Sequence, residues 1–181
     1  ASCLVGSEMC IRDRPKTALI SLSDKSNLEE LVNFLISENV KILSTGGTYS
    51  QIKNITNEVI EVSEFTGFEE MMDGRVKTLH PKIHAGILAR RDSDMEILKE
   101  KNYEPIDLVV VNLYPFQETI ASECSFEEAI EKIDIGGPTM IRAAAKNFKD
   151  VVVVSNPNDY KKLIEEWNCL LYTSDAADDT P

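Results

Sequence analysis

Lysines, a tyrosine and a carboxylate occur in short runs of the chain that follow apolar segments. The runs are RVKTLHP at 75–81, NLYPF at 112–116, DIGGP at 134–138 and RAAAKN at 142–147. A lysine can neutralise an anion or move a proton, and a carboxylate can accept or orient one. Because chemistry concentrates in loops, these runs are the first candidates for a functional site.

Two further polar runs follow the first predicted strands. STGGT at 44–48 lies where a strand gives way to a helix, and SDK at 23–25 ends the strand before it. Glycines let the backbone approach an anion, hydroxyls donate hydrogen bonds, and a helix N-terminus adds partial positive charge. A Gly-Gly turn alone is more often only a turn. With Lys25 at a neighbouring strand end, phosphate binding and a plain turn both stay open.

The other runs also have structural interpretations. The basic run at 75–81 could be a solvated loop, and the aromatic residues of NLYPF could plug the end of the sheet. Asp134 could cap a helix or form a turn, or it could be a partly desolvated acceptor. Lys146 alone would be a helix-end cation that the helix dipole favours.

His80 and His84 are four residues apart, a spacing that can pair metal ligands on a helix. Pro81 lies between them, and no acidic or cysteine ligand is in phase, so no metal site is predicted. We expect hydrogen-bonding or core histidines.

Composition limits the function classes. The net charge of −12 and the lack of a basic stripe argue against nucleic-acid binding. No apolar run reaches membrane-spanning length, so a soluble protein without membrane contact is expected. Only Cys124 of the four cysteines lies inside the apparent domain, which favours a reduced, cytoplasmic protein. An anionic substrate would need local cations, for which the candidates are Lys25, Arg75, Lys77, Arg142 and Lys146.

The two ends of the chain fit neither neighbouring pattern. Residues 3–14 and 169–179 can be back-translated as inverted copies of one DNA element and look like translated sequencing-adapter sequence. We therefore expect tails at 1–14 and 169–181. One domain is expected at 15–168, truncated at its C-terminal end.

Between these tails, apolar runs alternate with helical patterns, which predicts an α/β fold with a mostly parallel sheet and helices on both faces. Strands are expected at 17–22, 40–43, 58–62, 106–112 and 150–155. Two helices should open on capping boxes, Ser26 with Glu29 and Ser125 with Glu128. The other helices are expected near 49–53, 65–72, 94–101, 138–145 and 158–167, and a long polar loop at 73–82.

In order and spacing, five runs resemble the IMP cyclohydrolase domain of the bifunctional purine-biosynthesis enzyme AICAR transformylase/IMP cyclohydrolase. They are SDK, STGGT, GRVKTLHPKIHAGILAR, NLYPF and EKIDIGGPTMIRAAAKN. The resemblance implies a methylglyoxal-synthase-like, Rossmann-like fold. It also implies dehydrative closure of formylated AICAR (FAICAR) to IMP, with neither metal nor organic cofactor. Members of this family are homodimers, and their second domain, the transformylase, is not in this sequence.

Carried over by position, the resemblance implies three groups of site residues. Contacts to the nucleotide, largely at its phosphate, fall to Ser23, Asp24, Lys25, Thr45, Gly46, Gly47 and Thr48. The base side of the pocket would be lined by Arg75, Val76, Lys77, Thr78, Asn112 and Leu113. The site would be completed by Tyr114, Asp134, Ile135, Gly136 and Lys146.

The reaction suggests roles for some of these residues. Lys77 would stabilise the developing oxyanion, assisted by Tyr114 or the Gly136 amide. Asp134 would orient the carboxamide, and Lys146 would move protons as water is lost.

Three other functions stay open at this level. A methylglyoxal synthase would share the phosphate loop but would not explain the NLYPF and AAAKN runs. A regulatory module that binds a purine nucleotide without turnover would use the same fold. A purely structural domain would not need lysines gathered at strand ends.

Overall fold

Five parallel strands form the centre of the molecule. The computed structural model describes residues 14–113 and 125–175 of the chain. In these residues the sheet has the order β3-β2-β1-β4-β5. The strands are β1 (Thr17–Leu22), β2 (Lys41–Ser44), β3 (Val59–Glu61), β4 (Leu108–Asn112) and β5 (Val152–Val154). All four neighbouring pairs are parallel. The α/β class and the parallel sheet predicted from the sequence are confirmed.

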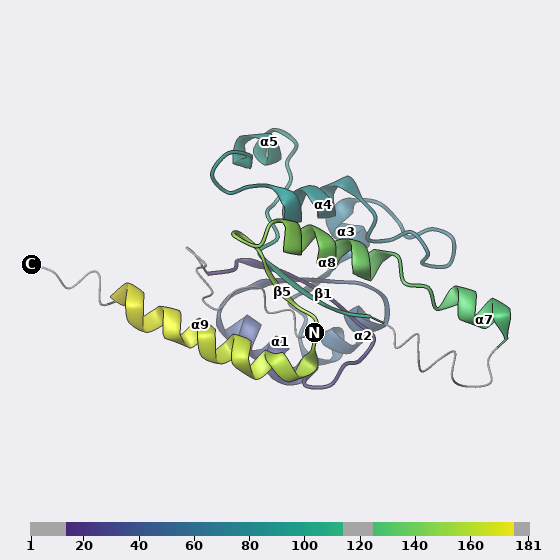
Figure 1. Ribbon diagram of the computed structural model, residues 1–181, viewed down its shortest axis with the longest axis horizontal. Coiled ribbons are helices and arrows are strands. Elements are labelled where there is room, and N and C mark those ends of the chain that lie inside the picture. The colour runs from purple at the N-terminus through teal and green to yellow at the C-terminus, as the bar shows by residue number, and fades with distance from the viewer. Residues whose placement is uncertain (1–13, 114–124, 176–181) are drawn as a thin grey trace, which may run out of the picture.

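Most residues of the strands are apolar because both faces of the sheet are covered. Every residue of β4 is buried, which is typical of a parallel strand packed between two helical layers. Figure 1 shows the two layers, one above and one below the sheet. One face carries α1 (Leu28–Ser37), α2 (Gly46–Ile55) and α9 (Tyr160–Asp175). The other carries α3 (Val62–Thr66), α4 (Pro81–Leu88) and α8 (Gly136–Lys146).

The order of the strands reverses next to β1. The chain moves outward from β1 through β2 to β3, and then returns to place β4 and β5 on the other side of β1. In such sheets the two sets of connections leave a crevice at the carboxyl ends of the central strands, and ligands bind there. The reversal therefore directs attention to the ends of β1 and β4.

Several predicted elements differ in the structure. Ser26 does not cap α1, because its hydroxyl donates to Asp24 and the helix starts after Asn27. The capping box of Ser125 with Glu128 is confirmed at α7 (Phe126–Glu131). The helix expected at 65–72 ends at Thr66, where Gly67 takes a left-handed conformation. Part of the predicted loop belongs to α4, whose first residue is a proline, a residue suited to that position.

Two short elements lie apart from the layers. Helix α5 (Met95–Glu100) buries only Leu98, and α7 buries none of its residues. Figure 1 shows α7 standing off the main body of the chain. None of the helices within the described residues is both long and apolar enough to cross a membrane.

Helix α9 packs against α1. Tyr160, Leu163 and Trp167 are buried against the α1 face, and the Trp167 ring meets Phe34 edge to face at 5.4 Å. The Trp167 indole N–H also donates to Glu38 at 3.1 Å. A 3₁₀ turn (Pro157–Asp159) leads into α9, which continues to Asp175. Residues 169–175 of the predicted tail are thus helical, and the predicted adapter origin of both tails remains a prediction.

We predict that Gly86→Ala destabilises the fold. A Cβ at this position of α4 would lie 2.7 Å from the Glu104 carbonyl oxygen and 3.1 Å from Ile106 Cγ1. Because a backbone group must shift, the free energy of unfolding should fall by about 1–3 kcal/mol in urea titrations. Gly47→Ala is the matched control, since its Cβ would meet nothing within 4 Å. An equal loss in both variants would contradict the steric argument.

Candidate active site

A cavity of about 530 Å³ opens at the carboxyl ends of β1, β2 and β4. Most of the predicted site residues line it: Ser23, Lys25, Thr45, Gly46, Gly47, Thr48, Arg75, Lys77, Thr78, Asn112, Asp134, Ile135 and Gly136. They come from segments far apart in the sequence. The strand ends and the segments at 73–78 and 130–137 bring them to one cavity.

The turn after β1 is tied to the end of β4. The side-chain oxygen of Asn112 accepts from the backbone N–H groups of Ser23 at 2.7 Å and Asp24 at 3.0 Å. Its side-chain nitrogen donates to the Asp24 carbonyl at 2.6 Å. The side chain of Asn112 is buried. The turn that carries Lys25 is therefore fixed by a neighbouring strand.

The loop after β2 is also tied to β1. The Thr48 hydroxyl accepts from the Leu22 N–H at 2.9 Å and donates to the Leu22 carbonyl at 3.0 Å. The single hydroxyl proton is thus already used inside the protein. Of the hydroxyls predicted to donate to a phosphate, that of Thr48 is a structural one. The N–H groups in the first turn of α2 lack intrahelical acceptors and remain suited to an anion.

Two lysines, Lys25 and Lys77, line the same cavity as the loop after β2. The Nζ of Lys77 lies 3.2 Å from the position that a Cβ at residue 46 would occupy, and 3.3 Å from the equivalent position at Gly74. Lys25 Nζ donates to the Ser23 carbonyl at 3.4 Å. Both side chains are half-buried and line the cavity. Together with the N–H groups at the start of α2, they are groups of the kind that bind an anion.

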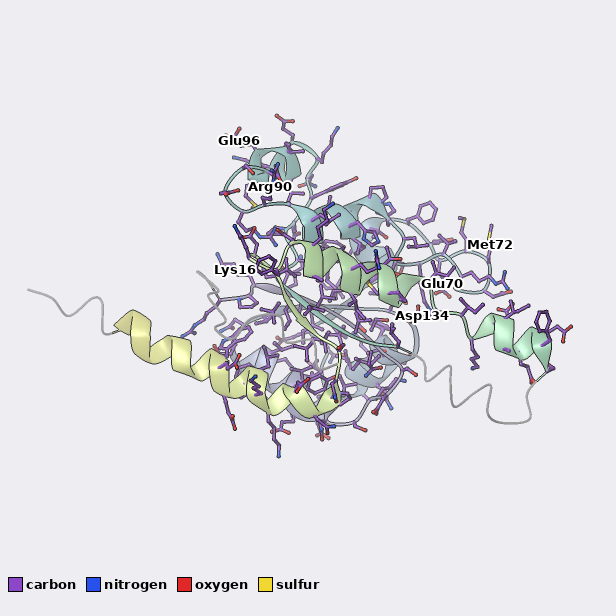
Figure 2. All side chains as sticks on the ribbon, viewed as in Figure 1. Lys16, Glu70, Met72, Arg90, Glu96 and Asp134 are labelled. Atoms are coloured by element: carbon purple, nitrogen blue, oxygen red, sulfur yellow. The ribbon has the colours of Figure 1, made fainter. Side chains whose placement is uncertain are left out.

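The segment before Lys77 forms the rim of the cavity. Met71 and Val76 pair as an antiparallel bridge, and the turn between them has positive φ at Met72, Asp73 and Gly74. Figure 2 shows Met72 extending outward on this turn. Arg75, on the same turn, forms an ion pair with Glu131 at the end of α7. Nothing in the sequence pattern indicated Glu131 as its partner.

The opposite wall is the start of α8. Asp134, the residue before the N-cap Ile135, accepts from the Gly137 N–H at 2.9 Å and so pairs one N–H of the first turn of α8. Its carboxylate also lines the cavity, near the start of α8 in Figure 2. A Cβ at Gly136 would collide with the Thr78 hydroxyl, so this helix start lies directly against the segment that carries Lys77. The loop at 44–48, called the anion loop below for its proposed role, and Asp134 consequently lie at the same cavity.

The two histidines have hydrogen-bonding roles. His80 caps α4, and its Nδ1 accepts from the Lys82 N–H at 3.1 Å. His84 is half-buried, and burial lowers its pKa, opposed by a hydrogen bond with the Thr78 backbone. The expectation of hydrogen-bonding or core histidines is confirmed for His80, whereas the Nε2 of His84 is buried without a hydrogen-bond partner among the described residues.

Four predicted residues do not line the cavity. Asp24 is exposed, and its carboxylate accepts from the N–H and the hydroxyl of Ser26, which lowers its pKa. Val76 makes the rim bridge, and Leu113 packs beside Gly137. Lys146 is the last residue of α8, about 15 Å along the helix axis from Gly136. The structure does not bring Lys146 to the cavity of its own chain.

Tyr114, predicted to assist at the oxyanion, lies outside the described residues. The lining also includes residues that sequence reasoning missed: Ser21, Leu22, Asp73, Gly74, Ile130, Glu131, Lys132, Ile133, Gly137 and Met140. Apolar residues such as Ile133 gave no signal, because an isoleucine near a helix end is usually a packing residue. A second concavity of about 410 Å³, beside α5, contains none of the predicted residues.

Known proteins resemble the chain over most of its length. Bifunctional purine biosynthesis protein PurH from Fusobacterium nucleatum subsp. nucleatum is 58% identical over 155 residues, which cover 84% of this chain and 31% of that protein. PurH from Clostridium acetobutylicum is 59% identical over 153 residues, covering 83% and 31%. The chain thus spans about a third of the length of these curated relatives. The resemblance to the bifunctional purine-biosynthesis enzyme is confirmed.

A solved structure, described as the crystal structure of ForH, has a TM-score of 0.71 and 36% sequence identity. The match covers 84% of this chain and 79% of that one. The model of the MGS-like domain family matches residues 27–139, more than half of the chain. The predicted methylglyoxal-synthase-like fold is thereby confirmed, and the chain belongs to the family of MGS-like domains.

Proposed function

We propose that this chain is an IMP cyclohydrolase that closes the purine ring of FAICAR with loss of water. The observation that carries the proposal is the meeting, in one cavity, of the anion loop with Lys77 and Asp134. The identity to PurH over 84% of the chain supports it. The transformylase activity of the bifunctional enzyme is not assigned to this chain.

The cavity suits a nucleoside monophosphate in size and polarity. Its volume of about 530 Å³ is within the usual range for small-molecule sites. We assign the phosphate to the end formed by Lys25 and the start of α2, where cations and free N–H groups meet. The base then extends toward Ile133 and Ile135, which supply an apolar wall before α8.

The reaction needs mainly proximity and a stabilised oxygen. The carboxamide nitrogen attacks the formyl carbon, a C–N bond forms, and the carbinolamine then loses its hydroxyl and a nitrogen-bound proton as water. Holding both groups in one cavity removes much of the entropic barrier. Charge grows on the formyl oxygen during attack, so a donor at that oxygen lowers the barrier. We assign this donor role to Lys77 and the orientation of the carboxamide to Asp134.

The position of Lys77 also supports a different role. Its ammonium lies beside Gly46 in the structure, at the phosphate end of the proposed site. A lysine that held the phosphate would contribute to binding in the ground state and in the transition state alike. A lysine that stabilised the oxyanion would act on kcat alone. Kinetics can separate the two roles.

We predict that Lys77→Ala lowers kcat for FAICAR at least about 100-fold while changing the Kd for IMP less than about threefold. Steady-state rates of IMP formation and calorimetric titration with IMP would measure both quantities. Lys53→Ala is the control, since Lys53 is an exposed lysine at the far end of α2. A large loss of IMP affinity with kcat nearly unchanged would assign Lys77 to the phosphate.

We further propose that the chain works as a homodimer in the cytoplasm, as the family resemblance implies. In a homodimer, Lys146 can act in the cavity of the other copy. Lys146 does not line the cavity of its own chain and is the last residue of α8. We therefore propose that it moves protons in the cavity of a second copy.

Mixing two inactive variants tests this arrangement. Lys77→Ala and Lys146→Ala should each have low activity. A re-equilibrated equal mixture should recover about a quarter of the wild-type rate, because half of the dimers then contain one intact cavity. Lys149→Ala, an exposed neighbour, should keep full activity and serves as control. No recovery in a mixture shown to exchange subunits would remove Lys146 from the proposed mechanism.

A further inference from the structure

Asn112 is the most heavily hydrogen-bonded side chain of the cavity wall among the described residues. It ends β4, directly opposite Leu22 of β1 in the parallel register. Its amide makes three hydrogen bonds of 2.6–3.0 Å, all to the backbone of Ser23 and Asp24. The partners fix the orientation of the amide, because two of them are N–H donors and the third is a carbonyl.

These bonds leave little of the amide for a ligand. An asparagine side chain offers two donor hydrogens and two acceptor lone pairs. Both lone pairs and one hydrogen are already used on the turn, so at most one N–H of Asn112 can face the cavity. The sequence predicted Asn112 as a ligand contact. The geometry indicates that its side chain acts mainly on the protein.

The turn that Asn112 holds carries part of the anion site. Ser23 and Lys25 line the cavity, and the Lys25 ammonium rests on the Ser23 carbonyl at 3.4 Å. On its outer side, the turn is closed by the Asp24 carboxylate, which accepts from Ser26. Asn112 supplies the inner support. The hydrogen bonds of Asn112 thus connect the end of β4 to the turn that carries the Lys25 ammonium.

We propose that Asn112 is a positioning residue, which fixes the Ser23–Asp24 backbone and so sets Lys25 against the phosphate of the substrate. This inference rests on the proposed function. It explains why an amide is needed at this point. A leucine would leave two partly buried N–H groups and one carbonyl unpaired. An aspartate would accept from both N–H groups but would place a carboxylate oxygen against the Asp24 carbonyl.

The experiment compares Asn112→Ala with Ser44→Ala in the full chain. Ser44 is a matched control because its hydroxyl makes a buried hydrogen bond to the Ile20 carbonyl between β2 and β1, and it does not line the cavity. IMP and inorganic phosphate are titrated by calorimetry well below the Tm of each variant. We expect Asn112→Ala to weaken both ligands about tenfold or more, and Ser44→Ala to lower Tm without changing either Kd.

A double-mutant cycle with Lys25→Ala separates positioning from general stability. If Asn112 acts through Lys25, its substitution in the Lys25→Ala background should weaken IMP binding by less than about threefold. Asn112→Asp should fall between alanine and wild type in Tm, since two of its hydrogen bonds can persist. Additive losses in the cycle, or equal Kd values for Asn112→Ala and wild type, would overturn the inference.

The same titrations identify a failure of the proposed function. A wild-type chain that binds phosphate but not IMP would refute the proposed nucleotide substrate, and the phosphate titrations of the variants would still decide the role of Asn112. A wild-type chain that binds neither ligand would overturn both proposals.

Discussion

The site depends on the parallel pairing of β1 with both β2 and β4. This pairing places the carboxyl ends of three strands at one edge of the sheet, where the backbone leaves its ladder and its polar groups lose their partners. Side chains of neighbouring segments replace those partners. Asn112 satisfies the turn after β1, Thr48 satisfies Leu22, and Ser44 donates to Ile20. This part of the cavity wall is therefore held together by hydrogen bonds within the protein.

This constraint changes how polar residues near the cavity should be interpreted. In the sequence, a hydroxyl or amide at a strand end looks like a ligand contact. In this structure, such groups hydrogen-bond to the backbone at the strand end instead. The Thr48 hydroxyl and most of the Asn112 amide are used inside the protein. The groups left for an anion are the cations, the hydroxyls of Ser23 and Thr45, and helix N–H groups. The proposed anion site therefore consists of Lys25, Lys77, these two hydroxyls and the start of α2.

The fold could be predicted because its signals are local. Buried parallel strands are continuous apolar runs, and the run at 108–112 is typical of such a strand. Most lining residues could be predicted because the family motifs occur in order. What escaped prediction was geometric. The Ser26 hydroxyl had a closer partner in Asp24, the Arg75–Glu131 pair joins segments far apart in sequence, and Lys146 shares a motif with the site but sits at the wrong end of α8. The spacing of motifs gives the order of elements along the chain, whereas the distances between side chains depend on how these elements pack.

Two helices begin at the cavity with a glycine pair, and the pairs serve different ends. At α2, Gly46 has a φ of +57° with Lys77 Nζ 3.2 Å from the position of a Cβ, and a Cβ on Gly47 would meet nothing within 4 Å. At α8, Cβ atoms on Gly136 and Gly137 would collide with Thr78 and Asp134, so these glycines permit close packing of the wall. The pair at α2 suits anion binding, whereas the pair at α8 allows close packing of the cavity wall. In a chain with net charge −12, the proposed phosphate must be attracted locally against the overall field, which is the role that we assign to the amides at the start of α2 and to the nearby lysines.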